Sequence, residues 1–76
     1  MSNTKTEILE ALIAIYVAEE KTAGTNLNNY LNNAAGIGEH PDIVAECKKL
    51  VKDIAEAREM IETVKTLVDE GSDNRE

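Results

Sequence analysis

The chain has few of the residues that staple small domains together or carry common chemistry. It contains one cysteine, one histidine and one proline, and neither Trp nor Phe. A single cysteine excludes an internal disulfide, and a single histidine argues against a protein-only zinc site. Two tyrosines are too few for a surface on which bases stack. No catalytic motif, phosphate-binding loop or repeat is present either, so we expect no enzyme activity, no cofactor and no metal.

Long apolar runs and positive charge are also scarce. The longest apolar run, Ala11 to Ala18, is far shorter than the ~20 residues that span a bilayer. Residues 1–6 lack the basic and apolar segments of a secretory leader. The chain has 8 basic and 15 acidic side chains and a formal charge of −7, which repels nucleic-acid phosphates and anionic lipids. We therefore expect a cytoplasmic protein that binds neither nucleic acid directly nor a membrane and that favours basic partners.

Apolar residues spaced alternately by four and three positions dominate both halves of the sequence. This spacing is typical of a helix with one continuous apolar stripe that packs on another helix. The two sets, called the seam residues below, are Leu9, Ile13, Tyr16, Glu20, Ala23, Leu27, Tyr30 and Ala34 in the first half, and Ile43, Cys47, Leu50, Ile54, Ala57, Ile61, Val64 and Val68 in the second. Glu20 is the only charged member. The pattern predicts helices over about 4–35 and 41–70.

Signals for helix ends agree with these two segments. Thr4 and Glu7 have the spacing of a capping box, Gly36 suits a left-handed residue after a helix end, and Pro41 suits a first helical turn. We predict a turn at 36–40 and a disordered polar tail at 71–76. The predicted fold is all-α, a single antiparallel helical hairpin over residues 1–76.

Folding the chain back at that turn fixes the order in which seam residues meet. Ala34 then lies opposite Ile43, and the pairs continue outward to Leu9 opposite Val68. Glu20 falls opposite Ala57, beside Arg58, so two interpretations of this charged seam residue stay open. It either reaches out to Arg58 or forms a polar layer that sets the register between subunits.

Gly24 leaves two alternatives for the first helix, because glycine in a helix interior costs ~1 kcal/mol relative to alanine. Either the helix continues and its small residues allow a close crossing, or it kinks or breaks there and Thr25 or Asn26 caps a new helix. The seam keeps its phase from Ala23 to Leu27, which favours a continuous helix.

The apolar residues outside the seam predict self-association. A two-helix contact hides only one narrow stripe, and a lone hairpin of this size buries little apolar surface. We therefore expect a homodimer or higher oligomer, with a four-helix bundle as the smallest assembly. The expected interface residues are Ile8, Leu12, Ile15, Val17, Val44, Val51, Met60 and Leu67.

Asparagines crowd the stretch 26–33, although asparagine is a poor helix former. They form either a solvated face near the turn or a hydrogen-bonding surface for a partner or small polar ligand, built from Asn29, Tyr30 and Asn33. The lone histidine, His40, adjoins Glu39 and lies near Asp42, but this spacing matches no known metal site.

The segment Gly36-Ile37-Gly38-Glu39-His40-Pro41-Asp42-Ile43, together with the size, acidity and asparagine content, resembles small uncharacterised acidic helical proteins of tailed bacteriophages, including cyanophages. The resemblance implies a host- or defence-directed binding protein or an assembly factor, made in the cytoplasm of an infected bacterium. It supplies no site residues. From the residues themselves we expect a non-enzymatic homo-oligomer that binds another protein. The alternatives are sequestration of a small polar ligand at a subunit interface, and an acidic mimic of nucleic acid that blocks a basic protein surface.

Overall fold

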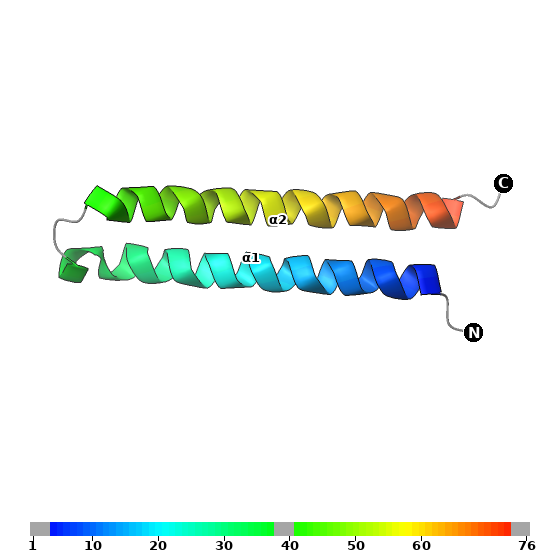
Figure 1. The fold of residues 1–76 in the computed structure, drawn as a ribbon, viewed down its shortest axis with the longest axis horizontal. Coiled ribbons are helices and arrows are strands. Elements are labelled where there is room, and N and C mark those ends of the chain that lie inside the picture. The colour runs from blue at the N-terminus through cyan, green and yellow to red at the C-terminus, as the bar shows by residue number, and fades with distance from the viewer. Residues whose placement is uncertain (1–3, 38–40, 74–76) are drawn as a thin grey trace.

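The chain folds as two long helices lying side by side and antiparallel (Figure 1). The computed structural model describes residues 4–37 and 41–73. Helix α1 covers Thr4–Ile37 and helix α2 covers Pro41–Asp73. Each is about 50 Å long at ~1.5 Å per residue, and the molecule measures 59 × 20 × 14 Å. The all-α hairpin predicted from the seam is therefore confirmed.

Both helices extend slightly further than the end signals predicted. α1 ends at Ile37 rather than near residue 35, and α2 ends at Asp73 rather than near residue 70. Gly36 is accordingly a helical residue and not a left-handed one that follows the helix. Glycine lowers helix propensity without blocking helical backbone angles, so it ends a helix only when the following residues favour another path. Residues 38–40 of the predicted turn and 74–76 of the predicted tail lie outside the described residues.

The seam lies between the helices along its whole described length. Each seam residue from Leu9 to Tyr30 and from Ile43 to Val68 is buried or half-buried. The most buried are Ala23, Ala57, Ile61 and Val64, each at most 8 % exposed. Periodicity alone thus identified the core, because side chains three and four positions apart share one helix face.

An ion pair between the helices shows the register directly. Arg58 Nε lies 2.7 Å from Glu20 Oε2 and donates a hydrogen bond to it. This contact places Glu20 opposite Ala57, as the folded-back sequence predicted, and confirms that Glu20 reaches out to Arg58. The Arg58 side chain is 69 % exposed, so the pair contributes at most ~1 kcal/mol and serves mainly to define alignment.

α1 is continuous through Gly24, so the alternative in which the helix breaks there and a new one begins is wrong. The close crossing is absent too, because a Cβ built on Gly24 would meet nothing within 4 Å. The glycine lies beside the seam rather than under α2, and the seam contacts on either side hold the helix through it.

An alanine at position 24 therefore has open space for its methyl group. We expect Gly24→Ala to raise the free energy of unfolding by about 0.5–1 kcal/mol, because it restricts the unfolded chain and meets no neighbour. Urea titration followed by circular dichroism measures this change. The reverse substitution at an exposed helical site, Ala14→Gly, should lower stability by a similar amount. A loss of stability in Gly24→Ala would mean that atoms of another chain approach Gly24.

The hairpin is one helix layer thick and leaves much surface uncovered. Its accessible area is 5867 Å², whereas a folded monomer of 8.3 kDa is expected to expose about 4,600 Å². The excess, roughly 1,300 Å² for one chain, is larger than the ~800 Å² that each partner buries in a specific interface. Neither described helix is long and apolar enough to cross a membrane.

Candidate functional site

The hairpin has two long edges, and residue spacing assigns side chains to each of them. Glu19 of α1 and Asp53 of α2 line the same groove, which marks one side; we name it the acidic edge. Lys21 and Arg58 are turned by roughly 140° or more from those two residues, at about 100° per residue. They lie on the opposite side, which we name the basic edge. The middle of the hairpin is therefore electrostatically two-sided.

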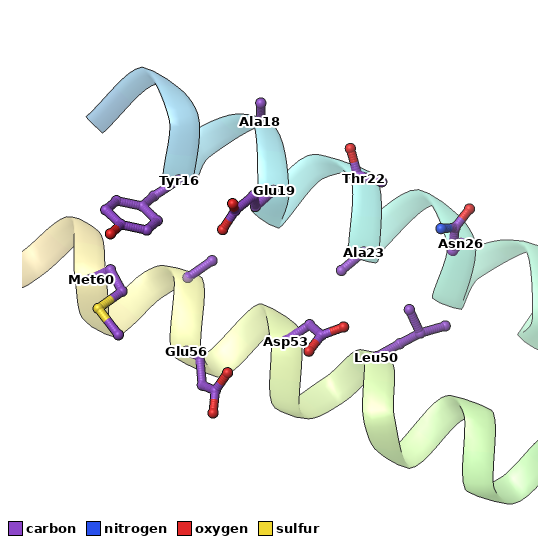
Figure 2. A pocket seen from close by; sticks show the side chains of 11 residues that line it. Tyr16, Ala18, Glu19, Thr22, Ala23, Asn26, Leu50, Asp53, Glu56 and Met60 are labelled. Atoms are coloured by element: carbon purple, nitrogen blue, oxygen red, sulfur yellow. The ribbon is translucent and has the colours of Figure 1, made fainter. Parts of the chain in front are cut away.

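Two small seam residues produce a groove on the acidic edge. Ala23 and Ala57 are almost fully buried, and their short side chains leave the space between larger neighbours open. The groove has a volume of about 520 Å³ and is lined by Tyr16, Ala18, Glu19, Thr22, Ala23, Asn26, Leu50, Asp53, Glu56, Ala57 and Met60. Figure 2 shows Tyr16 and Met60 at its end nearer the chain termini, and Asn26 and Leu50 at the other end.

This first groove combines an apolar floor with a negative rim. Glu19, Asp53 and Glu56 line it, and no basic side chain does. Lys52 Nζ lies 3.9 Å from Glu56 Oε2, but both side chains are more than half exposed, so the pair neutralises little of the charge. The arrangement favours a partner that offers apolar groups beside Lys or Arg.

A second groove, nearer the connection between the helices, contains the predicted asparagine face. Asn29, Tyr30 and Asn33 line it together with Asn26, Glu46 and Leu50, around a volume of about 500 Å³. Asn33 Nδ2 donates to the backbone oxygen of Asn29 at 2.9 Å and to Asn29 Oδ1 at 3.1 Å. This amide is therefore held within α1, whereas Glu46 adds a charged acceptor from α2.

The sequence did not identify Glu46 as part of that face. Its signal was available, since Glu46 precedes Asp53 by seven positions and so shares the acidic edge with it. Asn28 and Asn32 do not line the groove, because they point to other sides of α1. The asparagine-rich stretch is thus divided between a groove and the exposed outer surface.

Most of the predicted interface residues are exposed in the single chain. Six of them are between 42 % exposed, at Met60, and 74 % exposed, at Val44; the six are Ile8, Ile15, Val44, Val51, Met60 and Leu67. Leu12 and Val17 are half-buried beside the seam. Leu31, which was not among the predicted residues, is 62 % exposed. Leu31 follows Gly24 by seven positions and Val17 by fourteen, so it lies on the same flank of α1 as those two residues.

Residue spacing divides these side chains between the two edges of the hairpin, in two separate patches. The first, named the chain-end patch, lies on the acidic edge and consists of Ile8, Leu12, Ile15, Met60 and Leu67. The second, named the connection patch, lies on the basic edge and consists of Leu31, Val44 and Val51. Val17 lies on the basic edge between the middle and the chain ends. The two patches occupy opposite edges and opposite halves of the hairpin.

The remaining candidate positions offer less. His40 and Glu39 lie outside the described residues. Over residues 4–37 and 41–73, no three His, Cys, Asp or Glu side chains are grouped so that they could hold a metal ion. Cys47 is half-buried in the seam and packs there as a small apolar residue.

The described surface therefore offers two grooves and two apolar patches on a pair of helices. Grooves and exposed apolar patches of this kind are features of binding surfaces. Comparison of the chain with protein-family profiles, with curated proteins and with solved structures finds no match in any of the three.

Proposed function

We propose that this protein is a non-enzymatic helical protein that associates with copies of itself and acts by binding another protein. One observation carries the proposal: large apolar side chains remain exposed on both edges of a hairpin whose own seam is fully used. The chain also exposes roughly 1,300 Å² more than a compact monomer of its size is expected to expose. Covering it with further helices yields an assembly of at least two hairpins, or four helices.

The self-association is tested by sedimentation equilibrium over a wide range of protein concentrations. We expect the average mass to exceed that of one chain at micromolar concentration. Met60→Lys should weaken the association, because Met60 belongs to the chain-end patch and a charge there must be desolvated on binding. Ala45→Lys, at an exposed position on the outer face of α2, is the matched control and should change nothing. A stably folded monomer at all concentrations would exclude the proposal.

The partner protein is proposed to present a basic surface, since the chain carries a net charge of −7. In the phage context that the sequence resembles, it would be a host, defence or assembly protein. Affinity purification from the native host, at low and at high salt, tests this. Steep loss of a captured protein with added salt indicates recognition through charge, as in an acidic mimic of nucleic acid. Retention at high salt indicates recognition through the apolar patches.

A second candidate function is sequestration of a small polar ligand in the asparagine groove. The convergence of Asn26, Asn29, Asn33 and Tyr30 with Glu46 around about 500 Å³ favours it over a plain solvated face. A ligand present at 100 times its Kd should stabilise the protein by about 2.7 kcal/mol, which thermal melting across a metabolite and nucleotide panel detects. Asn26→Ala should abolish the shift and Asn32→Ala should preserve it. No shift across a broad panel would rule this function out.

A further inference from the structure

We propose that the copies assemble through two different surfaces, the acidic edge of one hairpin packing antiparallel against the basic edge of the next. The inference rests on the proposed self-association and specifies its geometry. In this arrangement the chain-end patch of one copy is covered by the connection patch of a second copy. The proposal follows from where the patches and charges lie along the hairpin.

The patches have matching positions along the long axis. The chain-end patch is centred near residues 12 and 64, and the connection patch near residues 31 and 48. At ~1.5 Å per residue, the chain-end patch lies about 12 Å and the connection patch about 15 Å from the middle of the hairpin, in opposite directions. A neighbour aligned on the same middle but pointing the other way therefore brings its connection patch over the chain-end patch. Side chains such as Leu67, 45 % exposed, and Val44, 74 % exposed, would then be covered together.

The charges in the middle of each edge are complementary in the same alignment. Glu19 and Asp53 occupy the middle of the acidic edge, and Lys21 is at the same level on the basic edge. Neither the Lys52–Glu56 pair nor the Glu20–Arg58 pair involves any of these three residues. Arg58, also at this level, shares its exposed guanidinium with Glu20. Antiparallel stacking of opposite edges thus places cations over carboxylates.

The alternative arrangements match less well. Two acidic edges facing each other about their middles would bring Glu19, Asp53 and Glu56 against the same residues of the second copy, and like charges in an interface are unfavourable. A parallel stack of opposite edges would place the chain-end patch against Glu10, Glu62, Lys65 and Asp69, which are all exposed and charged. Only the antiparallel stack of opposite edges covers both apolar patches and also brings opposite charges together in the middle.

When two copies pair through two different surfaces, one acidic edge and one basic edge of the pair stay uncovered. A third copy can add to either end, so the assembly grows with concentration unless curvature closes it into a ring. A closed dimer made from one self-complementary surface would stop at two copies. The two arrangements therefore differ in stoichiometry and in how edge variants behave when mixed.

Two double variants, each blocking one edge, test the proposal. Val44→Lys with Val51→Lys blocks the connection patch, and Ile15→Glu with Leu67→Glu blocks the chain-end patch. The four side chains are between 45 % and 74 % exposed, so the hairpin itself should tolerate the changes. Each substitution keeps the sign of its own edge. Circular dichroism confirms that both variants retain the helicity of the wild type.

We expect each variant alone to be monomeric, with self-association weakened about tenfold or more, and the equimolar mixture to form a 1:1 dimer that grows no further. The wild type should form species larger than a dimer. If either variant dimerises by itself, or if the wild type associates while the mixture stays monomeric, the two-surface arrangement is wrong and self-association stands. If the wild type is monomeric at every concentration, both the two-surface arrangement and the proposed self-association are wrong. Should a double variant lose helicity, the single substitutions Val44→Lys and Ile15→Glu provide the same comparison.

Discussion

Replacing Ile61 by alanine should lower the free energy of unfolding by about 2–3 kcal/mol. Ile61 is 8 % exposed and lies opposite Tyr16 in the seam, so the substitution removes buried methyl groups and leaves a gap. We expect the lower part of the usual range, because only one neighbouring helix covers the site. Against a total stability of roughly 4–11 kcal/mol for a chain of this length, this loss is large. Urea denaturation at a concentration where the chain is monomeric measures it.

Ile8→Ala is the matched control, because it makes the same chemical change at a side chain that is 55 % exposed. Its effect on the monomer should stay below about 1 kcal/mol, since half of the side chain already contacts water. Comparable losses at Ile8 and Ile61 would show that the helices do not pack along the predicted seam.

Placing a carboxylate in the same part of the seam should have the largest effect of all. Val64 is 5 % exposed, and Val64→Asp replaces its packing with a charge that has no partner in the seam. The expected loss is about 3–5 kcal/mol, enough to leave much of the chain unfolded at neutral pH. Far-ultraviolet circular dichroism at rising urea concentration measures the change. Thr66→Asp, at an exposed position, should change stability by no more than about 0.5 kcal/mol.

The Val64→Asp variant also makes a pH prediction with a definite sign. Burial raises the pKa of the new carboxyl above its value in the unfolded chain. Between those two pKa values the folded state binds more protons than the unfolded state, so stability relative to the wild type rises as pH falls. The difference between variant and wild type should therefore shrink on acidification. A difference that is constant with pH would mean that the introduced carboxylate reaches water.

Several of the expectations drawn from the sequence concern single helices, and these agree with the structure. The spacing of Leu9 through Tyr30 and of Ile43 through Val68 identified every described residue of the seam. The same spacing places Glu20 beside Arg58, and the two side chains form an ion pair. Such patterns succeed because one helix face is determined by local geometry, and the register of a hairpin follows once the two faces must meet.

Other features were not predicted because they depend on how the two helices meet. The groove over Ala23 and Ala57 arises because two small residues lie close together on different helices, which no pattern within one helix reveals. Glu46 joins the asparagine groove for the same reason. The helix ends at Ile37 and Asp73 were predicted two and three residues short for a different, local reason, because glycine only weakens a helix that its neighbours continue.

The sequence by itself determined that the chain forms two amphipathic helices, which residues of each helix face the other, and that apolar side chains remain outside that contact. These properties follow from helical periodicity and side-chain chemistry. Only the tertiary structure decided that Ala23 and Ala57 lie together at an open groove and that Glu46 of α2 joins Asn29 and Asn33 of α1 around a second one. Both grooves depend on how the side chains of two helices fill the space between them, which the spacing within one helix does not determine.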